Sequence, residues 1–140
     1  MEIRFAGEMD LTYLIANDRH VTPETVREKV MRGEIIVVSD GRELLGWLRF
    51  GYFWDVIPFI NMLAIEAPFR RQGIGRRLVL FWEASMRDRQ HGRVMTSTQS
   101  NEEAQHFYRK LGYRECGALI LDPEPLEILF VKTLAETGVK

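Results

Sequence analysis

The sequence predicts a mixed α/β fold in which one largely antiparallel sheet carries helices on both faces. The turn signal Asp40-Gly41 stands between two apolar, strand-like runs, which is typical of an antiparallel hairpin. Further on, an apolar strand, a helical stretch and another strand follow one another within residues 59–97, which implies a right-handed parallel crossover. The predicted order is therefore β-α-α-β-β-β-α-β-α-β-β, with one parallel β-α-β unit in a mixed sheet.

The first half of the chain supplies a strand, two helices and the hairpin. Residues 2–6 are predicted to form the first strand, and residues 9–18 the first helix. Thr22 and Pro23 are typical of a helix start, as cap and first-turn proline, and Gly33 is typical of the end of that helix. The hairpin strands are residues 34–39 and 43–50, and an aromatic run at 52–54 interrupts the pattern before the next strand.

The second half is predicted to contain four strands and two helices. The strands are residues 59–65, which is apolar enough to be buried on both faces, 93–97, 113–121 and 126–133. The apolar face of helix 76–90 is predicted to consist of Ile74, Leu78, Phe81, Trp82 and Ser85, and its solvent side of Arg76, Glu83, Arg87 and Gln90. Ser100 and Glu103 have the spacing of a capping box for the last helix, which Gly112 ends.

Composition limits the broad class of the protein. The chain has 140 residues, of which 46% are hydrophobic, so we expect a single domain over residues 1–140 with one core. A net charge of −1 provides no bulk attraction to nucleic acid or to an anionic membrane. No apolar run approaches the roughly 18–20 residues of a membrane span, and the first residues lack the apolar core of a signal peptide. We therefore expect a cytoplasmic protein with no nucleic-acid or membrane partner.

The stretch Arg70-Arg71-Gln72-Gly73-Ile74-Gly75 lies between the predicted strand 59–65 and the helix that follows it. The start of a helix presents unpaired backbone N–H groups and the positive end of the helix dipole, so this loop is predicted to bind an anion. A nucleotide P-loop is excluded because no lysine follows Gly75. A dinucleotide fingerprint is excluded because Leu78 stands where its third glycine belongs. An ordinary β–α turn with glycines is the alternative for these six residues alone.

Two sequence motifs resemble those of the GNAT acetyltransferase superfamily, and they occur in the same order along the chain as in that family. The first is Arg70-x-x-Gly73-x-Gly75, which is similar to the family's pyrophosphate loop. The second is Asn101-x-x-Ala104-x-x-Phe107-Tyr108 followed by Lys110-x-Gly112-Tyr113. The predicted order of elements is also that of the GNAT fold, so the resemblance covers essentially the whole chain.

The resemblance implies how coenzyme A would be held. Strands 59–65 and 93–97 are expected to splay apart, so that backbone groups of the first strand can bind the pantetheine arm. The implied cofactor-binding residues are Leu63, Ala64, Ile65, Arg70, Arg71, Gln72, Gly73, Ile74, Gly75, Arg76, Asn101 and Tyr108. Asn101 has an alternative interpretation as a first-turn helix residue. Tyr108 could be a core aromatic, whereas the resemblance implies a phenol that protonates the departing thiolate.

The implied reaction is direct transfer of an acetyl group from the cosubstrate acetyl-CoA to an amine, and it requires no metal. A backbone N–H near Leu63 or Ala64 would polarise the thioester carbonyl. Glu66 and Asp55 are the candidate catalytic bases, together with a water chain. Either carboxylate could equally be a solvated surface group.

The acceptor is predicted to be an amine, either a small cationic amine such as a polyamine or an aminoglycoside, or an amine of a protein or peptide. The resemblance places its contacts in the first helix pair and the loop between the last two strands. The expected acceptor contacts in those regions are Asn17, Asp18, His20, Asp122 and Glu124. The aromatic run Tyr52, Phe53 and Trp54 is expected to add an apolar wall. These residues could also be ordinary solvated loops. A non-catalytic acyl-CoA-binding sensor or interaction module is the alternative function, and a homodimer is one assembly that the resemblance allows.

Overall fold

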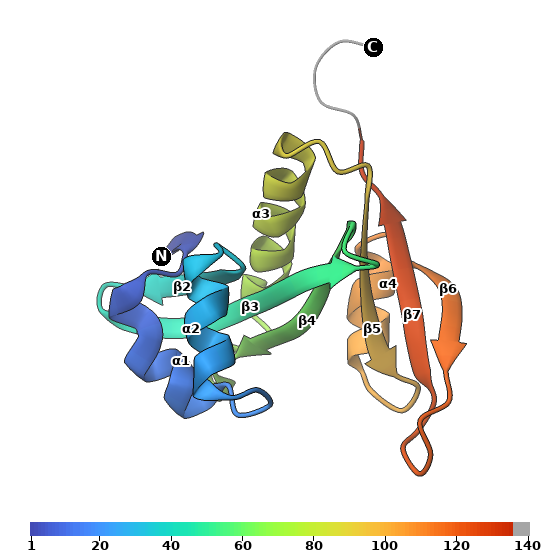
Figure 1. The fold of residues 1–140 in the computed structure, drawn as a ribbon, viewed down its shortest axis with the longest axis horizontal. Helices are drawn as coiled ribbons and strands as arrows, with labels where there is room; N and C mark the ends of the chain where they lie inside the picture. The colour runs from blue at the N-terminus through green and yellow to red at the C-terminus, as the bar shows by residue number, and fades with distance from the viewer. Residues whose placement is uncertain (136–140) are drawn as a thin grey trace. The chain divides into compact units, whose positions relative to one another are not determined.

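A computed structural model, which describes residues 1–135, confirms the predicted order of elements (Figure 1). The strands are β1 Glu2–Phe5, β2 Ile35–Asp40, β3 Glu43–Phe53, β4 Ile57–Ile65, β5 Arg93–Gln99, β6 Arg114–Leu119 and β7 Glu127–Thr133. The helices are α1 Leu11–Asn17, α2 Pro23–Met31, α3 Ile74–Asp88 and α4 Ala104–Lys110, with short 3-10 turns at Glu8–Asp10 and Ala67–Phe69. Within residues 1–135, no helix is long and apolar enough to cross a membrane.

The strands form one mixed seven-stranded sheet in the order β1-β2-β3-β4-β5-β7-β6. The pair β4–β5 is parallel, whereas β1–β2, β2–β3, β5–β7 and β6–β7 are antiparallel. The predicted fold class is therefore confirmed. The chain divides into two compact units, the first containing Met1–Phe50 and Met62–Trp82, and the second containing Gly51–Asn61 and the described chain from Glu83 on. The single domain over residues 1–140 stays a prediction.

The core of the first unit forms around β2, which is buried along nearly its whole length. Ile35 and Val37 pack with the helix residues Leu14 and Val26. On α3, Trp82 is fully buried, and its ring centroid lies 5.8 Å from that of Phe50. The local signals of this half behave as predicted: Gly41 takes a positive φ of 65° in the hairpin turn, and the Thr22 side chain accepts a hydrogen bond from the Thr25 amide.

Asp18 does not belong to a solvated loop. Its carboxylate is buried and accepts hydrogen bonds from Arg49 Nε at 2.7 Å and Nη2 at 3.3 Å. Arg49 lies on β3 and is itself buried, so the pair ties the end of α1 to the sheet of the first unit. The expectation that Asp18 contacts the acceptor is therefore wrong, because its charge is already matched inside the fold.

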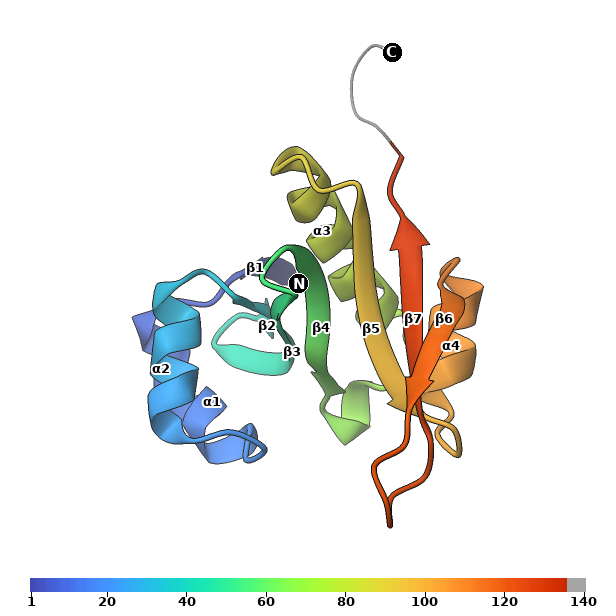
Figure 2. The same cartoon turned by 45° about the vertical axis from the view of Figure 1, so that its right-hand side comes forward.

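In the second unit, β5, β7 and β6 lie side by side, and α4 packs on one of their faces (Figures 1 and 2). The expectation that Glu83 faces solvent is wrong, because only 2% of it is exposed. Its carboxylate accepts hydrogen bonds from Tyr113 Oη at 2.7 Å and Lys132 Nζ at 2.8 Å. Helical periodicity could not predict this, because the partners are supplied by residues 30 and 49 positions later in the chain.

The predicted capping box of the last helix does not form. Helix α4 begins at Ala104, its N-cap is Glu103, and no side chain caps it. The Glu102 carboxylate instead accepts a hydrogen bond from the Gln99 amide at 2.7 Å. The Ser100 amide donates to the Leu126 carbonyl at 2.8 Å. Ser100 therefore belongs to a turn that is hydrogen-bonded to the residue just before β7.

Replacing Glu83 with alanine is expected to lower the free energy of unfolding by about 1–3 kcal/mol, because Tyr113 and Lys132 both lose a buried partner. Urea unfolding of both proteins measures the change. Asp88→Ala is the matched control, since Asp88 is exposed on the last turn of the same helix. Equal stability of Glu83→Ala and the control would show that the three-residue contact does not stabilise the fold.

Candidate active site

The loop that precedes α3 has a shape suited to anion binding. Arg71 and Gly73 adopt positive φ values of 63° and 80°, and Gly73 is a residue that adopts such a value without strain. The Arg77 amide donates to the Gly73 carbonyl at 3.1 Å, which marks the start of the helix. Among residues 1–135, no backbone carbonyl accepts a hydrogen bond from the amides of residues 71–76. These amides and the exposed side chains of Arg70, Arg71, Arg76 and Arg77 make the loop electropositive.

The end of β4 leads into this loop. The Ile65 carbonyl accepts a hydrogen bond from Arg70 Nε at 2.8 Å, and the Glu66 amide donates to the Leu45 carbonyl at 2.8 Å. A Cβ at Gly46 would lie 2.5 Å from the Ala64 carbonyl oxygen, so this close approach of β3 and β4 requires glycine. Leu63, Ala64 and Ile65 are half-buried, and their proposed contact with pantetheine stays a prediction.

The parallel pairing of β4 with β5 is short. Its register joins Phe59 to Met95 and Ile60 to Thr96. Thr96 Oγ1 donates a hydrogen bond to the Ile60 carbonyl at 3.1 Å, at the last of these pairs. The next residues, Asn61 and Ser97, continue their strands without pairing to each other in the described register.

Tyr108 lies on the α4 face of the sheet at this point. Only 4% of it is exposed, and its ring packs edge-on against that of Tyr113, with 5.3 Å between centroids. Burial raises the pKa of Tyr108 above its usual 10.0, against a smaller opposite effect of a hydrogen bond with the Thr96 side chain. The phenol is therefore protonated at neutral pH, and its catalytic role stays a prediction.

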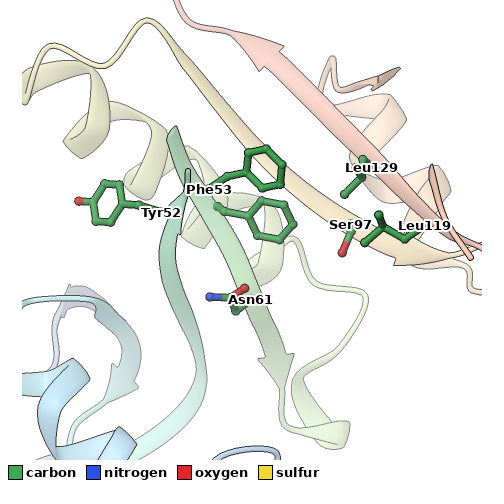
Figure 3. Close-up of a pocket in the computed structure, with 7 residues that line it drawn as sticks. Tyr52, Phe53, Asn61, Ser97, Leu119 and Leu129 are labelled. Atoms are coloured by element: carbon green, nitrogen blue, oxygen red, sulfur yellow. The ribbon is translucent and has the colours of Figure 1, made fainter. Parts of the chain in front are cut away.

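A pocket lies on the opposite face of the sheet. Because side chains alternate along a strand, Ser97 points away from the face that Thr96 shares with Tyr108. The pocket has a volume of about 290 Å³. It is lined by Tyr52, Phe53, Phe59, Asn61, Ser97, Leu119 and Leu129 (Figure 3). The prediction that residues 59–65 are buried on both faces is therefore wrong: Asn61 is exposed, since its face of β4 borders this pocket.

The remaining predicted residues are not among those that line the pocket. Asp55 is exposed in the turn between β3 and β4, with a positive φ of 62°, and Trp54 beside it is 78% exposed. Asn101 is exposed in the turn before α4. Glu66 is half-buried at the end of β4; burial first, and then the Glu66 carboxylate, raise the pKa of Tyr13 to about 12. Their roles as bases or cofactor contacts stay predictions.

Sequence reasoning missed a polar pair at the pocket wall. Ser97 Oγ donates a hydrogen bond of 2.6 Å to the carboxylate of Glu127, which is half-buried on β7. Ser97 pairs with Leu129 in the antiparallel register, so Glu127 lies diagonally across from Ser97 on the same face. Strand alternation in both segments could have indicated this face, but the pairing of β5 with β7 came only from the structure.

The buried phenols predict a loss of stability at high pH. Burial raises the pKa of Tyr108, and burial together with the Glu83 carboxylate raises the pKa of Tyr113, both from an ordinary value of 10.0. Above about pH 10 the unfolded chain releases these protons while the folded chain retains them, so the free energy of unfolding falls as pH rises. Urea unfolding between about pH 8 and about pH 11 measures this slope, and Tyr113→Phe should make it shallower. An identical slope in the variant would contradict the assignment to Tyr113.

A comparison of the sequence with models of known protein families identifies the family of this chain. A sequence model described as "Acetyltransferase (GNAT) domain" matches residues 31–115, which is more than half of the chain. No match was found among curated proteins.

Solved structures agree on the fold. Ard1 from Thermoplasma volcanium has a TM-score of 0.83 at 16% identity, covering 96% of this chain and 98% of its own. A ribosomal-protein-alanine N-acetyltransferase from Brucella melitensis has a TM-score of 0.80 at 20% identity, covering 96% and 100%. An aminoglycoside 6'-N-acetyltransferase complexed with coenzyme A has a TM-score of 0.78 at 20% identity, covering 99% and 100%. At these identities the structures show the fold alone, and the sequence match shows that this chain belongs to the GNAT acetyltransferase family.

Proposed function

We propose that the protein is an acetyl-CoA-dependent N-acetyltransferase that moves the acetyl group directly from the thioester to a primary amine. One observation carries the proposal: where the parallel pairing of β4 and β5 ends, a buried phenol lies on one face of the sheet and a pocket on the other. This arrangement provides a proton donor and an acceptor site on opposite faces of one short segment of sheet.

The loop before α3 fits the pyrophosphate of the cosubstrate. Its backbone amides at residues 71–76 have no backbone partner among residues 1–135, and arginines surround them. Arg70, Arg71, Gln72, Gly73, Ile74, Gly75 and Arg76 are the residues proposed to hold it. Leu63, Ala64, Ile65 and Asn101 are proposed to contact the rest of coenzyme A. A structural neighbour in complex with coenzyme A is consistent with this cosubstrate.

The proposed acetyl transfer needs one group that donates a proton to the leaving sulfur and one that accepts a proton from the amine. Acetyl-CoA supplies an activated acyl group, whose carbon forms a bond to the amine nitrogen while its bond to sulfur breaks. The amine attacks in its neutral form, so an ammonium group first releases one proton to solvent. The nitrogen then loses one further proton and the sulfur gains one, so the products are an amide and a free thiol. Tyr108 is proposed to give the proton to sulfur, because it is a buried phenol beside the end of the β4–β5 pairing. Glu66, Asp55 or water is proposed to take the proton of the amine.

The alternative function is a non-catalytic acyl-CoA-binding sensor or interaction module. Incubation with acetyl-CoA and a panel of amines, followed by measurement of free thiol, distinguishes the two functions. An acetyltransferase releases thiol only when an acceptor is present. Binding of acetyl-CoA without thiol release from any amine would favour the sensor.

Replacing Gly75 with glutamate tests the loop. We expect the affinity for coenzyme A to fall at least about tenfold, equivalent to about 1.4 kcal/mol, because a bulky anion at the helix start opposes a phosphate group. Calorimetric titration measures the affinity. Ala84→Glu is the matched control, because it places the same charge on an exposed position further along α3. Unchanged affinity in a folded Gly75→Glu protein would remove the loop from the binding site.

Replacing Tyr108 with phenylalanine tests the proton donor. We expect kcat to fall by about tenfold to a hundredfold, with the affinity for coenzyme A nearly unchanged. Steady-state rates between about pH 6 and about pH 9 measure the change. Tyr113→Phe is the control, since it removes the neighbouring buried hydroxyl, which bonds Glu83. A Tyr108→Phe enzyme with its full kcat would make Tyr108 a packing residue.

A further inference from the structure

The pocket on β4 and β5 has a mostly apolar lining. Phe53 and Phe59 lie nearly parallel, with ring centroids 6.0 Å apart and an interplanar angle of 19°. Leu119 and Leu129 line it from β6 and β7 (Figure 3). Asn61 and Ser97 add uncharged polar groups to this lining. A volume of about 290 Å³ is at the small end of the range for small-molecule sites, so the pocket suits one compact apolar group.

One carboxylate stands directly behind the pocket wall. Glu127 accepts the Ser97 hydrogen bond and is opposite Leu119 in the register of β6 and β7. Leu129 is two positions further on the same face of β7, so Glu127 is bordered by lining residues. The Glu127 carboxylate is thus bonded to a lining residue, whereas the Asp18 carboxylate is paired with Arg49 in the first unit. The pocket is therefore mostly apolar, and the Glu127 carboxylate places a negative charge at its wall.

We infer that this pocket selects a primary amine that carries a single apolar side group, aromatic or branched aliphatic, with Glu127 attracting its ammonium group. The inference rests on the proposed function and gives its acceptor a chemical class. A polyamine or an aminoglycoside would bring several charges to a mostly apolar lining, and charges that remain unpaired are costly to desolvate.

Two sources supply this chemistry: a free arylalkylamine, and the first residue of a peptide whose N-terminal side chain is apolar. Both present an amine close to an apolar group. The length of the acceptor beyond the pocket distinguishes them, so each source needs its own arm in the test.

The test combines binding and turnover on the full chain in the presence of coenzyme A or acetyl-CoA. Calorimetry measures the affinities of 2-phenylethylamine, a tripeptide with N-terminal phenylalanine, and spermidine. We expect at least one of the first two to bind about tenfold more tightly than spermidine, because only they bury an apolar group. The tighter of the two identifies the source. Equal or tighter binding of spermidine would overturn the inference.

The same experiment separates failure of the inference from failure of the proposed function. Tight binding of the apolar amine without release of thiol would reject the acetyltransferase activity and leave the pocket's selectivity in place. Release of thiol with spermidine alone would support the activity and overturn the selectivity. Neither binding nor release with any amine would overturn both.

A matched pair of variants tests the apolar wall. Leu119 lines the pocket and is 45% exposed, whereas its neighbour Ile120 is 77% exposed and outside the lining. Both positions accept asparagine without burying a polar group. Leu119→Asn should weaken 2-phenylethylamine about fivefold to tenfold and leave spermidine unchanged, while Ile120→Asn should change neither. Equal effects of the two substitutions would contradict the assignment of the wall.

A second pair tests the charge. Glu127→Gln keeps an oxygen that can accept the Ser97 hydrogen bond but removes the negative charge. It should raise KM for the amine about tenfold, with the difference shrinking at high salt. Glu115→Gln is the control, because Glu115 is exposed on β6 and pairs with Arg109. An unchanged KM in Glu127→Gln would remove this carboxylate from acceptor binding.

Discussion

The short parallel pairing of β4 with β5, at Phe59–Met95 and Ile60–Thr96, is the constraint on which the candidate site depends. Backbone N–H and C=O groups inside a sheet require partners, and parallel pairing normally supplies them along the whole strand. Here Thr96 donates its hydroxyl to the Ile60 carbonyl at the last pair, and the next residues, Asn61 and Ser97, are not paired with each other. Tyr108 and the pocket lie on opposite faces of this point, so the proposed proton donor and acceptor site both depend on the pairing ending where it does.

Buried charges fix the elements around these sites. The Asp18–Arg49 pair joins α1 to β3, and Glu83 joins α3 to Tyr113 and to Lys132 on β7. Removing such charges from water is costly, and their attraction offsets that cost only when the geometry is good. Each cluster therefore favours a specific arrangement of elements that are distant in the chain. Because Tyr113 packs edge-on against Tyr108, the Glu83 cluster also constrains the buried phenol.

Charge and apolar surface are separated between the candidate sites. The loop before α3 concentrates arginines and free backbone amides, which suits a phosphate group. The pocket on β4 and β5 presents aromatic and leucine side chains, with Glu127 behind its wall. A chain with a net charge near zero thus concentrates positive charge at one candidate site and apolar surface at the other.

The amino-acid sequence alone predicts the order of elements, the hairpin at Asp40-Gly41, the loop at residues 70–76 and the family motifs. These are local signals: turn residues, periodicity and the spacing of a short loop do not depend on distant partners. The tertiary structure alone decided that Glu83 and Asp18 are buried, because Tyr113, Lys132 and Arg49 reach them from other elements. It also decided that Ser100 does not cap its helix, and that Ser97, Glu127 and Leu129 share the face of the pocket. Strand alternation predicts which residues share a face of one strand, but the register between strands is set by packing across the whole sheet.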